Sequence, residues 1–138
     1  MAPITETARK FFEACETGKG WDGCKAFCQP DATFSAQAEP LRKITRLDAY
    51  CDWMKAAFVP MPNAHYDLKA FAADEERQTV LAFAVFKATH THDGGPVPPT
   101  GKSMTTDYVY AMRLSGGKVS HLTKVWHSGL ALKDLGWV

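Results

Sequence analysis

A tight glycine turn between two alternating segments constrains this chain more than any other feature of its sequence. Residues 105–114 alternate between polar and apolar or aromatic types, and a similar alternation resumes over residues 119–127. Between them lies Ser115-Gly116-Gly117-Lys118, where both glycines can adopt the positive φ angles of a two-residue hairpin turn. The sequence therefore predicts an antiparallel hairpin near the C-terminus.

The turn also predicts a register, because residues paired across two strands lie on the same face of the sheet. With Gly116 and Gly117 at the turn, Leu114 is expected opposite Val119. Further along, the same face would carry the pairs Met112 with His121, Tyr110 with Thr123, Tyr108 with Val125, and Thr106 with His127. The opposite face would carry Asp107, Val109, Ala111, Arg113, Leu122, Lys124 and Trp126. That second face is apolar enough to predict a packed surface such as a subunit contact.

Length and charge narrow the class of protein. A chain of 138 residues can bury a core of its own, and we treat residues 1–138 as a single domain. The formal net charge is +1 without any run of lysine and arginine, which argues against nucleic acid or a membrane surface as partner. No apolar stretch approaches the roughly 18 residues of a membrane span, and the N-terminal segment lacks a signal core. We therefore expect a cytoplasmic protein.

Apolar residues at helical spacing precede the strands. They predict a helix capped by Thr5 and ended near Gly18, a short helix over residues 21–27, and a third from Thr45 to Pro60. Strands are expected at residues 32–35, 65–73, 79–89, 105–114 and 119–127. A last short helix, capped by Ser128, is expected over residues 130–135.

Four cysteines raise the question of a metal site. Cys24 and Cys28 stand four residues apart, and no pair has the Cys-x-x-Cys spacing that holds a tetrahedral zinc. Three of the four fall on apolar helix stripes, where a thiol packs as a small hydrophobic group. Buried free thiols are therefore the prediction, in preference to a metal centre or a disulfide.

The order of elements predicts an α+β fold, in which N-terminal helices cover the concave face of a curved antiparallel sheet. A sheet curved in this way forms a cone with a pocket inside it. The chain is rich in aromatic residues, and a pocket walled by them selects a flat, hydrophobic small molecule. Trp53, beside the apolar stripe of the third helix, is the expected contact from the helical side.

The C-terminal part also carries short motifs. Thr89-His90-Thr91 leads into Pro98-Pro99-Thr100-Gly101-Lys102, Gly117-Lys118-Val119 opens the last strand, and Leu135-Gly136 closes the chain. In these motifs the chain resembles the nuclear transport factor two-like superfamily, and within it the SnoaL-like polyketide cyclase branch. The resemblance implies the cone-shaped fold, a pocket, no cofactor, and a homodimer paired through the outer face of the sheet. Trp126 is expected at that dimer interface.

The sequence departs from this branch where the branch places its catalytic groups. The acid/base carboxylate of the branch corresponds to His127, and its Glu-x-Trp motif corresponds to His121 and Thr123. A neutral imidazole can also accept a proton near physiological pH. We therefore expect catalysis by His127 with Tyr108 and His121. The expected substrate contacts are Trp53, Thr106, Tyr110, Thr123 and His90.

Two functions stay open at this point. One is a cofactor-independent cyclase, isomerase or dehydratase that acts by acid/base chemistry on a small hydrophobic carbonyl compound. The other is a non-catalytic ligand-binding or dimerisation module, in which His127 caps the terminal helix or makes one fixed hydrogen bond. A metal held by His90 and His92 is disfavoured because their loop offers only Asp93 as an acidic ligand. His90 is expected instead to hold the proline-rich loop by hydrogen bonding.

Overall fold

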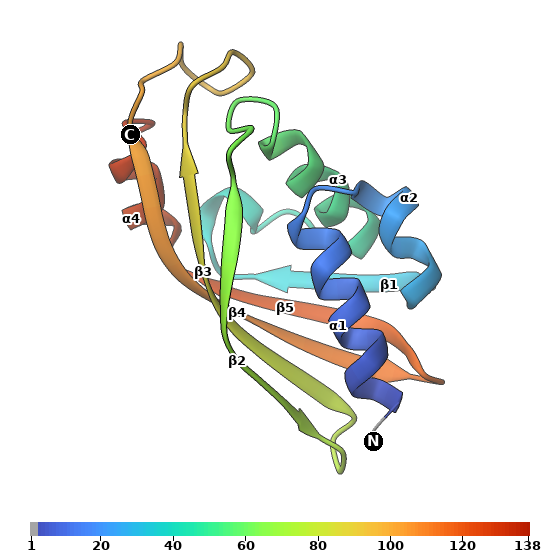
Figure 1. Cartoon of the computed structure of the whole chain (residues 1–138). Coiled ribbons are helices and arrows are strands. Elements are labelled where there is room, and N and C mark those ends of the chain that lie inside the picture. Colours follow the sequence, from blue (N-terminus) through green and yellow to red (C-terminus); the bar gives the residue numbers. More distant parts are fainter. Residues whose placement is uncertain (1–2) are drawn as a thin grey trace.

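The computed structural model describes residues 3–138 as a curved sheet with helices packed into its concave side (Figure 1). The helices are α1 (Pro3–Glu16), α2 (Gly20–Cys24), α3 (Leu47–Ala57) and α4 (Ser128–Asp134). The strands are β1 (Cys28–Ala36), β2 (His65–Asp74), β3 (Thr79–Thr89), β4 (Ser103–Ser115) and β5 (Lys118–Trp126). Short 3₁₀ turns at Lys25–Phe27 and Glu39–Leu41 flank β1. The predicted α+β class and curved sheet are confirmed.

The five strands are ordered β1-β5-β4-β3-β2 across the sheet. Strands β2 to β5 form antiparallel neighbours, whereas β1 runs parallel to β5, with Phe34 opposite Leu122. The prediction of a wholly antiparallel sheet is therefore wrong at β1. The chain leaves β1 through α3 and not through a hairpin, so no tight turn forces an antiparallel partner on it.

The hairpin turn is as predicted, but the register beyond it is not. Gly116 and Gly117 have φ angles of 59° and 77°, and Leu114 pairs with Val119. The next pair joins Arg113 to His121, so that Ser120 is an extra residue and forms a β-bulge. A shift of one residue moves every later side chain of β5 to the other face.

The bulge follows from the packing demands of β5. Val119 and Leu122 are both fully buried, yet residues three apart point to opposite faces of a regular strand. Inserting Ser120 places both inside. As a result Lys124 and Trp126 also face the helices. The side chains of His121, Thr123 and Val125 lie on the outer face of the sheet.

The core lies between the helices and the concave face. Helix α1 buries the predicted stripe of Ala8, Phe11, Phe12 and Cys15, and α3 buries Leu47, Tyr50, Cys51 and Met54. These side chains pack on inward residues of β3 and β4 such as Val80, Ala84, Tyr110 and Met112. Within residues 3–138, none of the helices combines the length and apolar character needed to cross a membrane.

Candidate functional site

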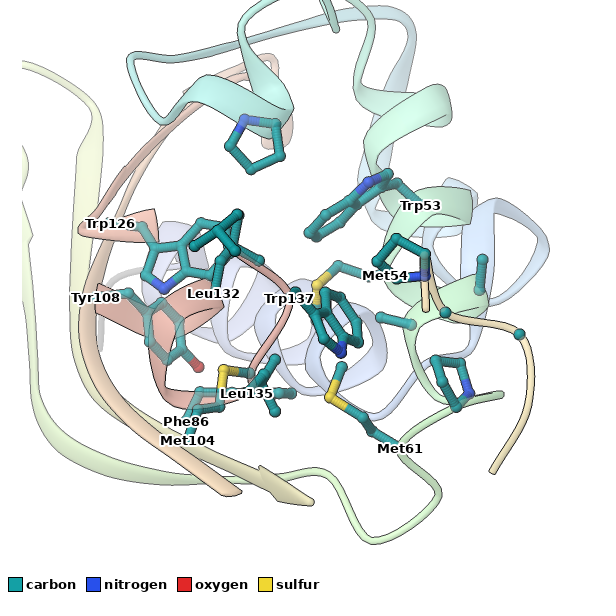
Figure 2. A pocket seen from close by; sticks show the side chains of 18 of the residues that line it. Trp53, Met54, Met61, Phe86, Met104, Tyr108, Trp126, Leu132, Leu135 and Trp137 are labelled. Atoms are coloured by element: carbon teal, nitrogen blue, oxygen red, sulfur yellow. The ribbon is translucent and has the colours of Figure 1, made fainter. Parts of the chain in front are cut away.

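A cavity of about 460 Å³ lies between the inner face of the sheet, α3 and the C-terminal segment. Figure 2 shows the side chains around it, which come from α3, from strands β3 to β5, and from the chain end after β5. Most of the wall is hydrocarbon or aromatic ring, and the labelled residues are Trp53, Met54, Met61, Phe86, Met104, Tyr108, Trp126, Leu132, Leu135 and Trp137. Among the described residues that line the cavity, Glu16 and Lys124 have ionisable acidic or basic side chains. Such a wall suits an apolar ligand held at a few polar points.

Two of the indoles in the wall are held from behind by hydrogen bonds. Trp126 Nε1 donates to Thr106 Oγ1 at 3.1 Å, and Trp137 Nε1 donates to His90 Nδ1 at 2.9 Å. Trp53 approaches Trp126 edge to face, with ring centroids 6.3 Å apart. These hydrogen bonds fix the orientation of the Trp126 and Trp137 indoles in the cavity wall.

A chain of buried hydrogen bonds connects Lys124 to Glu16 behind the cavity wall. Lys124 Nζ donates to Tyr50 Oη at 3.0 Å, and Tyr50 Oη lies 2.5 Å from Tyr110 Oη. Tyr110 Oη in turn donates to Glu16 Oε2. We call this series of hydrogen bonds, Lys124–Tyr50–Tyr110–Glu16, the buried relay. It joins β5, α3, β4 and the last residue of α1.

Burial dominates the electrostatics of the relay. It raises the pKa of Glu16, although the charge of Lys124 and the phenols of Tyr108 and Tyr110 act in the opposite direction. Burial likewise lowers the pKa of Lys124, against the opposing effect of Glu16. Both shifts favour the uncharged forms, because a low-dielectric surrounding disfavours charge. The phenol pKa values of Tyr50, Tyr108 and Tyr110 are also raised, first by burial, so all three stay protonated.

Two polar atoms of this group have no partner in the described part of the chain. Tyr108 Oη and Glu16 Oε1 are both buried and make no close hydrogen bond there, although the phenol of Tyr108 lies near enough to the Glu16 carboxyl to lower its pKa. Both residues line the cavity. A buried polar atom left without a partner costs about 1–3 kcal/mol. A ligand oxygen or hydroxyl in the cavity would satisfy these atoms and recover part of that cost.

Sequence reasoning missed Glu16 and Lys124, although each leaves a signal. Glu16 follows Phe12 by four residues and so extends the apolar stripe of α1. Lys124 stands two residues from both Leu122 and Trp126, and so shares their face of β5. In each case a charged residue occupies a position whose neighbours on the same face are apolar.

The three residues expected to act on the substrate lie apart from one another. Tyr108 lines the cavity as expected. His127 is exposed and caps α4, because Leu130 N donates to its Nδ1 at 3.0 Å; this also corrects the predicted cap, Ser128. His121 lies on the outer face, where its ring bonds Thr33 and Ser35 at 2.7 and 3.0 Å. Because of the bulge at Ser120, the imidazole of His121 lies on the outer face of the sheet, whereas the phenol of Tyr108 lies on the inner face.

The expected substrate contacts divide in the same way. Trp53 lines the cavity, while Tyr110 and Thr106 lie on the inner face behind it. Thr123 faces outward beside His121, at 3.1 Å from its Nε2. His90 is fully buried and positions Trp137. Its backbone also bonds Lys102 O and Gly101 N, at the end of the proline-rich loop.

Trp126 lies on the opposite side of the sheet from the predicted one. It was expected on the outer face at a dimer interface, but it lines the cavity. The reason is again the one-residue shift at the bulge. The outer face instead presents Leu81, Phe83 and Val125, which are 47%, 39% and 61% exposed.

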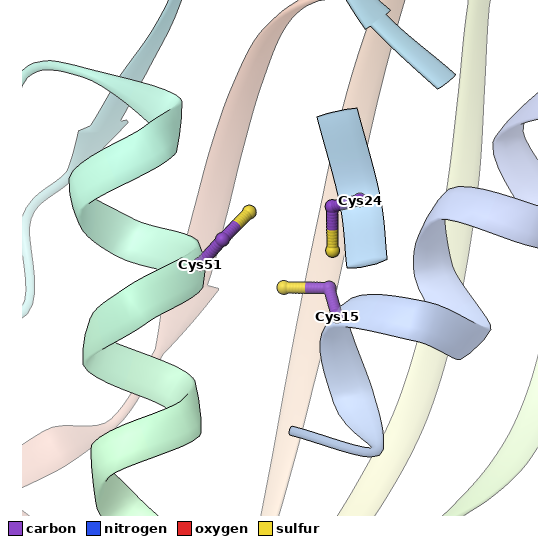
Figure 3. Close-up of side chains that lie close together, drawn as sticks. All are labelled: Cys15, Cys24 and Cys51. Atoms are coloured by element: carbon purple, nitrogen blue, oxygen red, sulfur yellow. The ribbon is translucent and has the colours of Figure 1, made fainter. Parts of the chain in front are cut away.

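Three thiols meet where α1, α2 and α3 come together (Figure 3). The Sγ atoms of Cys15, Cys24 and Cys51 lie within 4.8 Å of one another, a spacing that would also allow a shared metal ion. All three side chains are fully buried. Burial raises the pKa of the Cys15 thiol, whereas hydrogen bonds from Cys15 and Cys51 lower the pKa of the Cys24 thiol to about 4. All three are free cysteines packed in the core, as the sequence predicted.

The fold and cavity define a class of protein: an α+β cone whose inner face lines a largely apolar cavity. The sequence matches the SnoaL-like domain over residues 8–122, and the chain belongs to that family. Among functionally curated proteins, no significant match was found.

Solved structures share the whole fold. AclR from Streptomyces galilaeus, a proposed hydroxylase, has a TM-score of 0.79 at 20% identity, over 100% of this chain and 83% of its own. A proposed SnoaL-like polyketide cyclase from Jannaschia sp. CCS1 has a TM-score of 0.79 at 14% identity, over 96% and 91%. IdmH, a proposed polyketide cyclase from Streptomyces antibioticus, has a TM-score of 0.74 at 18% identity, over 96% and 98%. At these identities the likeness concerns the fold.

Proposed function

We propose that the protein binds a small apolar carbonyl compound in the cavity and catalyses an acid/base step on it, as a cyclase, isomerase or dehydratase does. The observation that carries this proposal is the pair of unpartnered polar atoms, Tyr108 Oη and Glu16 Oε1, at the wall of an otherwise apolar cavity. Polar atoms of this kind in a cavity wall are points where a bound molecule can be held by hydrogen bonds. The likeness to proposed polyketide cyclases agrees with a carbonyl ligand.

In this proposal Tyr108 and Glu16 divide the work. The Tyr108 hydroxyl donates to the carbonyl oxygen of the ligand and stabilises the negative charge that develops there. The carboxylate of Glu16 takes the proton from the adjacent carbon. Its raised pKa makes it a stronger base than an exposed carboxylate. Lys124 adds positive charge near the developing enolate when it is protonated.

The three tryptophans of the wall provide a binding assay. Trp53, Trp126 and Trp137 line the cavity, so a planar ketone such as 2-tetralone is expected to quench their fluorescence. Turnover is followed by exchange of the ketone's α-hydrogens in D₂O, measured by proton NMR. The wild-type protein should bind the ketone and exchange its α-hydrogens faster than buffer does.

Variants then separate binding from chemistry. Glu16→Gln keeps the size of the side chain and should leave affinity within about twofold, while exchange falls by about 100-fold or more. Glu13→Gln changes an exposed acid on the same helix and is the matched control. If Glu16→Gln exchanges at the wild-type rate, the proposed base is wrong. Binding without exchange in the wild type would support the non-catalytic ligand-binding module.

We also propose that two subunits pair through the outer face of the sheet. Leu81, Phe83 and Val125 are large apolar side chains exposed on that face. Exposed apolar side chains gathered on one sheet face are typical of a subunit contact. The polar cluster of His121, Thr33 and Ser35 borders the same face and would supply its rim.

A further inference from the structure

Lys124 carries a chemical capacity that hydrogen bonding at the site does not use. It is one of eleven lysines in the chain. Its side chain is 6% exposed and reaches the cavity wall, whereas the other ten lysines are all exposed. A primary amine inside an apolar cavity is a nucleophile whenever it is uncharged.

The surroundings of Lys124 favour the uncharged form of its amine. Within residues 3–138, Lys124 forms no ion pair with a carboxylate; the buried relay connects it to Glu16 instead. If Lys124 passes a proton to Tyr50, and each phenol passes its own proton onward, Glu16 Oε2 receives one. The charged pair then becomes a neutral amine and a neutral acid, without any water molecule. Burial favours this direction at both ends of the relay.

Aromatic rings around Lys124 stabilise a cation at the same place. Its Nζ lies 4.5 Å from the ring centre of Trp126, 5.2 Å from Tyr50 and 5.5 Å from Tyr108. Ring faces attract a cation at such distances, and the attraction is larger where water is excluded. The site can therefore hold the nitrogen both as a free amine and as a positively charged product.

We propose that Lys124 forms a protonated imine with an aldehyde or ketone bound in the cavity. The inference rests on the proposed function for its ligand class, a carbonyl compound, and adds a covalent intermediate to it. The geometry that supports it is the combination of an amine at the cavity wall, the relay behind it, and the unpartnered Tyr108 hydroxyl beside it. Tyr108 would hold the carbonyl oxygen while the amine attacks the carbonyl carbon.

The step balances with the groups present. The ammonium of Lys124 first gives one proton through the relay to Glu16. The amine nitrogen then bonds to the carbonyl carbon, the π electrons move to oxygen, and a proton passes from nitrogen to that oxygen. Glu16 returns its stored proton, the hydroxyl leaves as water, and the nitrogen lone pair forms the C=N bond. The sum is ammonium plus carbonyl giving protonated imine plus water, without oxidant or reductant.

Such an intermediate would make the proposed chemistry easier. A protonated imine withdraws electrons from the neighbouring carbon more strongly than a neutral carbonyl does. The same Glu16, again a carboxylate after water has left, can then take the α-proton. The amine and the carboxylate thus act in sequence on one ligand.

Reductive trapping of the full-length wild-type protein tests the imine directly. The protein is incubated at neutral pH with 6-methoxy-2-naphthaldehyde and sodium cyanoborohydride, and the modified lysines are mapped by peptide mass spectrometry. Each unit by which a lysine pKa is lowered gives tenfold more free amine at neutral pH. We expect the Lys124 peptide to be modified at least about tenfold faster than the peptides of the exposed Lys87 and Lys118, which serve as internal controls.

Two further measurements keep the inference falsifiable. An excess of 2-tetralone should lower the amount of naphthaldehyde adduct on Lys124 but not on Lys87, because the ketone competes for the cavity, which Lys124 lines and Lys87 does not. Tyr50→Phe, which removes the first relay hydroxyl, should slow labelling of Lys124, whereas Tyr66→Phe should not. Labelling spread over the exposed lysines with Lys124 unmodified would overturn the imine. If that happened while α-exchange still depended on Glu16, the proposed function would stand without it.

Discussion

Replacing Tyr110 by phenylalanine removes a single oxygen from the middle of the buried relay. The ring itself keeps its packing, since Phe12 and Tyr108 lie at centroid distances of 5.2 and 5.5 Å. Three hydrogen bonds are lost, of which the one with the Cys15 thiol, at 3.8 Å, is the weakest. The neutral bond to Tyr50 contributes about 1 kcal/mol to stability at any pH. The bond to Glu16 contributes about 1.5–3 kcal/mol when the carboxyl is ionised, and much less when it is protonated.

The loss of the hydrogen bond to Glu16 gives the variant a pH dependence whose sign can be worked out. Burial already raises the folded-state pKa of Glu16, so its contribution to stability is largest at low pH and declines as pH rises through that pKa. Without the Tyr110 donor the pKa of Glu16 rises further, because the ionised carboxylate loses a hydrogen bond that stabilises it. Tyr110→Phe should therefore cost about 1 kcal/mol at acid pH and about 2.5–4 kcal/mol above both pKa values.

Urea unfolding followed by tryptophan fluorescence, repeated from pH 4.5 to 9, measures this difference. Tyr66→Phe is the control, because the Tyr66 ring also packs on Phe12, at 5.1 Å, but stands outside the relay. Its cost should stay small and change little with pH. A Tyr110→Phe cost that is equal at every pH would refute the reasoning, since Glu16 would then not depend on that hydroxyl.

Three other substitutions test separate parts of the structure. Gly18→Ala should lower stability by about 2–4 kcal/mol in thermal melts, because Gly18 has a φ of 76° and a new Cβ would lie 2.7 Å from Phe58 Cδ1. His127→Ala should cost about 1 kcal/mol through loss of the α4 cap, with ketone affinity and exchange unchanged, and His127→Asp should restore the stability; a loss of exchange would return His127 to the chemistry. Phe83→Glu should convert a dimer into monomers in analytical ultracentrifugation, and a dimer that persists would place the contact elsewhere.

The helices and the hairpin turn could be predicted because local signals decide them. The stripe of α1 and the two glycines at 116 and 117 depend on neighbours in sequence, and the structure agrees with both. The bulge could not be predicted in the same way. The sequence of β5 has apolar residues at both parities, Val119 and Val125 on one side and Leu122 and Trp126 on the other. Burial in the whole fold decides which set turns inward.

Part of the candidate site could be predicted from the sequence. Trp53 and Tyr108 were expected from their aromatic character and their elements, and both line the cavity. Glu16 and Lys124 were assigned no role, because charged side chains are seldom fully buried and most acids at helix ends are solvated. Only the three-dimensional pairing of α1 with β4, through Tyr110, shows that the two charges belong to one network.

The bulge at Ser120 decides which of two sets of β5 side chains faces the interior. Deleting that single residue would restore regular pairing after Leu114, turning the imidazole of His121 and the hydroxyl of Thr123 toward the helices. The same deletion would carry the Lys124 amine and the Trp126 indole to the surface. Strand order, turn and overall chain path would all survive. In this architecture, then, the deletion of one codon would change which side chains of β5 face the interior without substituting any amino acid of the strand.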